Sequence, residues 1–227
     1  MVANRRRKRK GITVAAVLLL VVGLGVLFFP QLHQLFFQQQ INQVKKEFMQ
    51  ERLPGDDLYE FLKKENERLF AEGQSGLVDA FSYERPAVDL SRYGIKDNCI
   101  GFISLPFIKI ELPIYLGANT ENMLKGAVHM TETSYPIGGE NTNSVIAAHR
   151  GRSVRQFREI DKIRIGDLIT ITNFRETLVY RACEIKIIYP DDIQEIQIKS
   201  GRDLITLISC HPLGNNYQRY VVYCERA

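Results

Sequence analysis

The chain has 227 residues, of which 45% are hydrophobic, and a formal net charge of +4. Six of its basic residues form an unbroken run at positions 5–10, and without them 24 Lys and Arg stand against 26 Asp and Glu. The rest of the chain is therefore close to neutral and lacks the basic surface that a nucleic-acid-binding protein needs. We expect no nucleic-acid partner.

Residues 11–29 form an uncharged run rich in Val and Leu, and about 20 apolar residues cross a bilayer as a helix. The basic run at 5–10 predicts a cytoplasmic tail over residues 1–10 that contacts anionic lipid, with the rest of the chain on the extracellular face of the cell membrane. A cleaved signal peptide is the alternative. Its apolar part is usually shorter, roughly 7–15 residues, and ends at a small-x-small site, whereas this run ends in Phe28-Phe29-Pro30. We expect an uncleaved, single-pass transmembrane helix.

Beyond the anchor, apolar residues recur at roughly helical spacing over 30–53. Asp56 is suited to be the N-cap of a second helix that ends near Gly73. The sequence therefore predicts membrane-proximal helices over 30–73. Residues 74–98 have no clear periodicity and predict a long loop, and loops of this length in compact domains are often functional.

From residue 99 onward the pattern changes to short runs rich in Ile, Val, Thr and Tyr, separated by turn residues. This pattern predicts a mainly β fold, a closed antiparallel β-barrel of about eight strands over 99–227. Short helices are expected at 121–126 and 154–163. The expected strands are 100–105, 108–115, 143–148, 168–174, 177–189, 203–210 and 218–224.

The four cysteines, Cys99, Cys183, Cys210 and Cys224, are far apart in the sequence, and each lies in a strand-like run. An extracytoplasmic chain can use four cysteines as two disulfides, but cysteines in such runs are commonly buried free thiols. The sequence has no C-x-x-C motif of the kind that indicates a zinc site. The Asp191-Asp192 pair is explained by a turn after Pro190. We expect neither a metal nor a cofactor.

Cys210 is the residue that carries most information about chemistry. It ends an apolar run, and Arg219 begins the next one after a turn that contains Pro212 and Gly214, so a hairpin would set the two side by side. His149 also ends an apolar run. A thiol acts as a nucleophile in its thiolate form, which a nearby positive charge favours. A thiol, an imidazole and a guanidinium at strand ends are the groups needed for acyl transfer through a thioester.

The other histidines are weaker candidates for that chemistry. His211 follows Cys210 directly, and in a strand it would point to the opposite face. Pro212 suggests that the strand ends there, which keeps His211 as a candidate at the rim of the site. His129 is predicted to be a pocket-wall or core residue, and His33 lies just after the anchor.

These residues carry a resemblance to a known family. Thr206-Leu207-Ile208-Ser209-Cys210 resembles the sortase signature Thr-Leu-x-Thr-Cys, and Ala148-His149-Arg150-Gly151 is similar to the Gly-His-Arg-Gly around the sortase histidine. Arg219 falls where the sortase arginine falls, and Leu-Pro-Ile-Tyr at 112–115 and Pro-Ile-Gly-Gly at 136–139 also match. The resemblance covers residues from about 99 to the end. It implies a sortase-type barrel, catalytic roles for Cys210, His149 and Arg219, substrate contacts for Ser209 and His129, and no cofactor.

The segment before the barrel resembles class C, the pilin-polymerising sortases. Asp79-Ala80-Phe81 is similar to the Asp-Pro-aromatic motif of the class C lid. The resemblance implies that Asp79 faces Arg219 and that Phe81 covers Cys210. The sequence departs from class C in having Ala80 in place of the proline, and in stopping at Ala227 where many members have a further transmembrane helix. A solvated loop with one anchoring ring is the alternative for this segment.

The resemblance implies a cysteine transpeptidase on a Gram-positive-type cell. Its substrate would be a pilin or surface protein with a Leu-Pro-x-Thr-Gly-like sorting signal, and a pilin lysine would accept the acyl group. A housekeeping or minor-pilin enzyme that uses a cell-wall precursor amine is the first alternative, and a non-catalytic, membrane-tethered assembly module is the second. A papain-type hydrolase fits less well, because its cysteine normally opens a helix and precedes its histidine.

Overall fold

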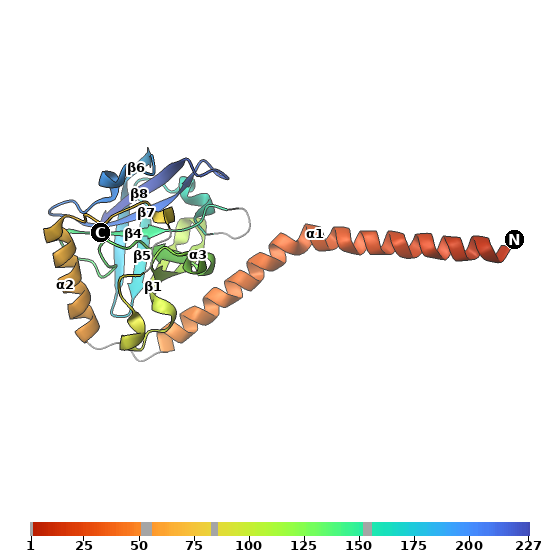
Figure 1. Cartoon of the computed structure of the whole chain (residues 1–227), viewed down its shortest axis with the longest axis horizontal. Coiled ribbons are helices and arrows are strands. Elements are labelled where there is room, and N and C mark those ends of the chain that lie inside the picture. The colour runs from red at the N-terminus through yellow and green to blue at the C-terminus, as the bar shows by residue number, and fades with distance from the viewer. Residues whose placement is uncertain (1, 51–55, 83–85, 152–155) are drawn as a thin grey trace.

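The computed structural model describes residues 2–50, 56–82, 86–151 and 156–227, and the side chains of these residues except 2–12 and Ala80. A long N-terminal helix, α1 (Val2–Gln50), projects from a globular body that holds every strand (Figure 1). Its apolar part is long enough to cross a membrane and is not buried against protein. This helix can therefore serve as a single-pass membrane anchor.

The expected anchor and the first membrane-proximal helix belong to one helix. α1 continues through Pro30 without interruption. A proline removes one intrahelical hydrogen bond and favours a bend, and Figure 1 shows that α1 bends partway along its length. Leu27 lies before the proline and Gln31 and Leu32 follow it, and these residue types favour the continuation of the helix.

The C-terminal part of α1 packs against the globular body. Ile41 and Phe48 are buried there, and the ring of Phe48 meets that of Phe102 edge-on with centroids 5.5 Å apart. Lys45 reaches Glu111 on the barrel, with an Nζ–Oε1 distance of 2.6 Å. Fully burying each large apolar side chain contributes roughly 1.5–3 kcal/mol. The anchor therefore continues into a helix that is fixed to the barrel.

The second helix, α2 (Asp56–Glu72), agrees with the predicted one and buries Leu58, Leu62 and Leu69. Its first turn carries two acidic residues, which the helix dipole favours. The predicted loop over 74–98 contains three short 3₁₀ turns in its described part: Ala80–Ser82, Leu90–Tyr93 and Lys96–Asn98.

Eight strands form the closed barrel in the order β1-β2-β3-β4-β7-β8-β6-β5. All seven predicted strands are present, and the structure adds β3, which is too short to show a pattern in the sequence. The strands are β1 (Cys99–Leu105), β2 (Ile110–Leu116), β3 (Ala127–His129), β4 (Thr142–Ala147), β5 (Leu168–Asn173), β6 (Thr177–Ile188), β7 (Asp203–His211) and β8 (Gln218–Arg226).

The barrel is mixed, so the prediction of an antiparallel barrel is wrong in part. β2 pairs with β3 and β4 pairs with β7 in parallel, while the other pairs are antiparallel. Parallel neighbours need a long connection. The chain between β4 and β7 supplies one, since it contains β5 and β6. Parallel pairing sets the C-terminal ends of β4 and β7 at the same end of the barrel.

Short helical elements fill the connections. α3 (Thr120–Lys125) matches the predicted helix at 121–126. The helix predicted over 154–163 is a 3₁₀ segment, Phe157–Lys162, and the start of that prediction lies outside the described residues. Two further 3₁₀ turns cover Pro106–Ile108 and Ile193–Ile196. All four cysteines are free thiols, and of these Cys99 and Cys224 are buried.

Candidate functional site

The hairpin of β7 and β8 brings Cys210 and Arg219 together. They are direct partners in the antiparallel register, and paired residues of this kind have their side chains on one face with Cβ atoms about 5 Å apart. Cys210 is partly exposed, whereas the side chain of Arg219 is only 5% exposed. The structure therefore places the thiol beside a buried guanidinium.

The parallel pairing of β4 and β7 brings the third group to the same place. Ala147, the last residue of β4, pairs with Ile208, and two residues further along each chain lie His149 and Cys210. Two hydrogen bonds hold the backbone of His149. Its N–H donates to Gln156 Oε1 over 3.0 Å, and its carbonyl accepts from Phe157 N–H over 3.0 Å.

Asp79 covers the guanidinium of Arg219. Arg219 Nε donates to Asp79 Oδ1 over 2.7 Å and Arg219 Nη2 donates to Oδ2 over 2.8 Å. Such a two-pronged contact is the strong form of an arginine–carboxylate pair. The remaining nitrogen, Nη1, donates to the carbonyls of Asn216 and Gln218 over 2.6 and 3.0 Å. Each guanidinium nitrogen of Arg219 thus has a partner within the protein.

Phe81 lies between the arginine and the histidine. Its ring centroid is 4.8 Å from Arg219 Cζ and 6.1 Å from the centroid of the His149 ring. The Phe81 backbone N–H donates to Asp79 Oδ2 over 3.1 Å, which fixes the two residues relative to each other. The ring of Phe81 thus lies over both Arg219 and His149, whereas the resemblance implied that it covers Cys210.

Burial at this site affects the ionisation of Cys210 and His149. Burial raises the pKa of the Cys210 thiol. The charge of Arg219 opposes this rise and the charge of Asp79 adds to it, so that the pKa stays above its ordinary value. Burial also lowers the pKa of His149. In the covered state the structure favours an uncharged thiol and an uncharged imidazole.

His211 lies on the opposite side of β7 from Cys210. Its Nδ1 is 3.1 Å from Arg150 Nη1, and its ring centroid is 5.8 Å from that of Tyr220. The strand continues through His211, so the alternation of side chains still holds at that position. This placement favours His149 over His211 as the partner of the thiol.

The two residues that we expected to contact substrate are both buried. Ser209 is 0% exposed and its hydroxyl donates to the Ala148 carbonyl over 2.6 Å. His129 is 3% exposed, and its Nε2 lies 3.0 Å from the carbonyl oxygen of Ser134. Neither side chain has a surface to offer a ligand, because strand pairing and barrel closure enclose them. Ser209 instead ties the strand that carries Cys210 to the strand that leads to His149.

The burial of His129 makes folding sensitive to acid. Burial lowers the pKa of this imidazole from 6.5 to about 4. As the pH falls from about 6.5 to 4, the unfolded chain binds a proton at this residue that the folded chain does not bind, so stability falls across that window. The loss is about 3 kcal/mol. Denaturant unfolding at pH 7 and pH 4.5 should show most of this loss in the parent protein, and His129→Gln should lose less between the two pH values. An equal loss in both proteins would contradict the prediction.

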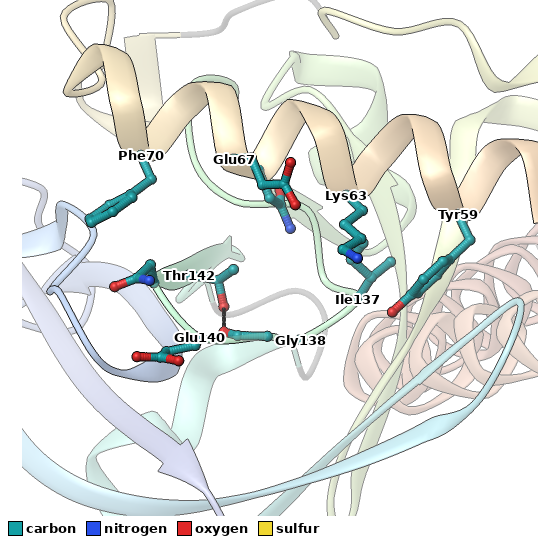
Figure 2. A pocket seen from close by; sticks show the side chains of 11 residues that line it. Tyr59, Lys63, Glu67, Phe70, Ile137, Gly138, Glu140 and Thr142 are labelled. Carbon is teal, nitrogen blue, oxygen red and sulfur yellow. Dashed lines mark hydrogen bonds between the residues drawn. The ribbon is translucent and has the colours of Figure 1, made fainter.

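The cavity in Figure 2 lies away from this chemistry. It is about 230 Å³ in volume and lies between α2 and the segment that leads into β4, with Tyr59, Lys63 and Phe70 of α2 directed toward Gly138 and Glu140. None of its lining residues belongs to the group around Cys210. Within the described ranges, no cluster of three His, Cys, Asp or Glu side chains is placed to hold a metal ion. Asp192 accepts from the Tyr189 N–H and forms the predicted turn.

Sequence reasoning missed two residues that support the site. Gln156 is fully buried and bridges the His149 backbone to the Met123 carbonyl. Nothing in the sequence around it marks this role. Arg150 is also buried, with its guanidinium beside β7. Its position next to His149 was the available signal.

Comparisons with known proteins agree with this geometry. The family described as "Sortase domain" matches residues 103–227. Sortase D of Bacillus subtilis is 30% identical over 129 residues, which are 56% of this chain and 63% of that protein. The chain thus spans slightly less than two thirds of the length of this curated relative.

Solved structures match a larger part of the chain. Sortase C1 of GBS pilus island 1 is 30% identical with a TM-score of 0.73, covering 84% of this chain and 91% of that one. Sortase C from Clostridium perfringens SM101 is 30% identical with a TM-score of 0.68, covering 83% and 98%. Together with the family match over more than half of the sequence, these results show that the chain belongs to the sortase family, whose members are cysteine transpeptidases.

Proposed function

We propose that this protein is a class C-type sortase that joins pilin subunits. The observation that carries the proposal is the contact of Asp79 and Phe81 with Arg219 and His149, a cover formed by the segment before the barrel. Similarity to the solved structures of sortase C1 of GBS pilus island 1 and of sortase C from Clostridium perfringens supports it. The substrate would be a pilin or surface protein with a Leu-Pro-x-Thr-Gly-like sorting signal.

In the proposed mechanism, the Cys210 thiolate attacks the carbonyl carbon of the threonine in the signal. Negative charge develops on the carbonyl oxygen, and the Arg219 guanidinium stabilises it once Asp79 has moved away. The C–N bond to glycine breaks while His149, as the imidazolium, gives its proton to the leaving amine. The acyl group remains on Cys210 as a thioester.

In the second half of the proposed reaction, the amine of a pilin lysine attacks the thioester. His149, now neutral, takes the proton of the attacking amine, and the C–S bond breaks to release the Cys210 thiolate. The product is an isopeptide bond between subunits. Attack by water in place of the amine gives only hydrolysis, so the acceptor must reach the thioester first.

A cell-wall precursor amine is the second candidate for the acceptor. The chain is also similar to curated relatives named sortase A and sortase D, at 25–30% identity, so its similarity is not limited to proteins named sortase C. The groups around Cys210 would be the same for either acceptor. The difference would lie in which amine is bound near the thioester.

We also propose that the barrel faces outward. The basic run at 5–10 is expected to stay in the cytoplasm, with its positive charge near anionic lipid. α1 then leaves the membrane and packs against the barrel through Phe48 and Lys45. This arrangement holds the reactive residues outside the cell, where secreted proteins pass.

The test supplies peptides to intact cells that display the protein. A sorting-signal peptide is added together with a lysine-containing pilin peptide, a short glycine peptide that represents a wall-precursor amine, or no amine. We expect an isopeptide product with the lysine peptide, in a yield at least several times that with the glycine peptide. Hydrolysis alone in every mixture would contradict transpeptidation. The peptides do not cross the membrane, so product formation in cells but not in their Cys210→Ala counterpart also supports the outward orientation.

A further inference from the structure

Behind the two strands of the hairpin, Arg150 contacts the end of β7. Its Nη1 lies 3.1 Å from His211 Nδ1 and makes a longer contact of 3.5 Å with the carbonyl oxygen of Cys210. Its Cζ lies 5.5 Å from the centroid of the Tyr220 ring, which belongs to β8. The guanidinium therefore touches the backbone of Cys210 itself, from the side away from Arg219.

The other nitrogens of Arg150 hold the segment that follows β4. Nη2 forms an ion pair with Asp161 Oδ2 at 2.8 Å, and Nε donates to the Arg158 carbonyl over 3.3 Å. Both partners belong to the 3₁₀ segment Phe157–Lys162. That segment also binds the backbone of His149, through the Phe157 N–H. Arg150 thus joins the support of the histidine to the end of β7.

The burial of Arg150 indicates that this arrangement is more than a surface ion pair. Its side chain is 3% exposed, whereas that of Asp161 is 51% exposed. Placing a charge in the interior costs several kcal/mol unless partners compensate on all sides. A planar guanidinium with five donors can meet a carboxylate, two carbonyls and a ring nitrogen at once, which a lysine ammonium cannot do in the same geometry.

Two sets of contacts therefore lie on either side of Cys210 and His149 along the chain. The Ser209 hydroxyl binds the Ala148 carbonyl just before Cys210 and His149, and Arg150 binds just after them. We infer that Arg150 is a positioning residue. It fixes the spacing of His149 and Cys210 because it binds both the 3₁₀ segment Phe157–Lys162 and the end of β7. This inference rests on the proposed roles of Cys210 and His149.

The variants Arg150→Met and Arg150→Lys test the inference, with Asp161→Asn as a milder change that leaves Arg150 in place. Arg202→Lys is the control, because Arg202 likewise forms an ion pair, with Glu225, but contacts none of the groups around Cys210. The measurements are kcat and KM for peptide ligation, counted per reactive thiol, the melting temperature, and the pH dependence of thiol alkylation.

We expect Arg150→Met to lower kcat per reactive thiol on the order of 10- to 100-fold, because small misplacement of reacting groups has effects of this size. KM should change by less than about twofold, since Arg150 is buried and is not expected to contact the substrate. Asp161→Asn should lower kcat less, in the same direction, and Arg202→Lys should leave it unchanged.

Arg150→Lys separates geometry from charge. The Arg150 cation lowers the pKa of Cys210, against the effect of burial, so Arg150→Met should move the alkylation profile to higher pH and Arg150→Lys should leave it in place. Arg150→Lys should still lower kcat, because it lacks the planar fork. An unchanged kcat per reactive thiol in Arg150→Met, or an equal loss in Arg202→Lys, would overturn the inference. Failure of the proposed function would instead appear as product formation that survives Cys210→Ala.

Discussion

Replacing Cys210 by alanine is expected to abolish the covalent adduct with a sorting-signal peptide and to lower ligation on the order of 10⁴-fold or more, as removal of a nucleophile does in other enzymes that act through an acyl intermediate. The barrel should keep its stability within about 1 kcal/mol. Cys210 lies at the end of β7 and is partly exposed, so alanine removes few packed atoms. Intact-mass measurement of the adduct and a thermal melt check the two expectations.

Cys183→Ala is the matched control for this experiment. Cys183 is also a partly exposed free thiol in a strand, and it lies beside Arg202 instead of Arg219. Its removal should leave both the adduct and the ligation rate as they are. An adduct that persists in Cys210→Ala and disappears in Cys183→Ala would show that Cys183 is the nucleophile, and this would contradict the proposed mechanism.

The strands could be predicted because their residues are local signals. Runs such as Thr206–Cys210 are β-branched and apolar, and the turns between them carry Pro, Gly and Asn. The pairing of β4 with β7 could not be predicted in this way. It joins segments about 60 residues apart, and an apolar run that is buried on both faces looks the same whether its neighbour is parallel or antiparallel.

That pairing decides the geometry of the site. If β4 and β7 ran in opposite directions, their C-terminal ends would lie at opposite ends of the barrel, and His149 could not lie beside Cys210. Motif similarity selected Cys210, His149 and Arg219 without any knowledge of the pairing. It could not reveal that Ser209 and His129 are enclosed, because burial depends on which segments close over a residue after the chain has folded.

The covered state combines three features that oppose reaction. The pKa of Cys210 is raised by burial and that of His149 is lowered by burial, so the thiolate–imidazolium pair is disfavoured. The Arg219 donors that could bind a substrate carbonyl are instead bound to Asp79. In the proposed mechanism, a substrate must therefore displace Asp79 before Arg219 can stabilise negative charge. Under the proposed mechanism, we interpret the described structure as a resting form that opens before it acts.

Asp79→Ala tests this interpretation directly. It removes both hydrogen bonds to Arg219 and leaves the guanidinium buried beneath Phe81 without its carboxylate, which destabilises the covered state. A loss of only about 1.4 kcal/mol raises the open fraction tenfold, so alkylation of Cys210 should become at least tenfold faster. The negative charge of Asp79 also adds to the raised pKa of Cys210, so the alkylation profile should move to lower pH.

Three further variants separate the cover from a general effect of charge. Phe81→Ala removes the ring and keeps the carboxylate, and it should also speed alkylation, but with a smaller shift of the pH profile. Asp79→Asn keeps the shape and loses the charge, so its rate should lie between those of Asp79→Ala and the parent protein. Glu140→Ala removes an exposed carboxylate that lies on the segment before β4 and should change nothing. If the parent, Asp79→Ala and Phe81→Ala proteins all react at one rate, then residues 79–81 do not control access to Cys210, and the class C proposal loses the observation on which it rests.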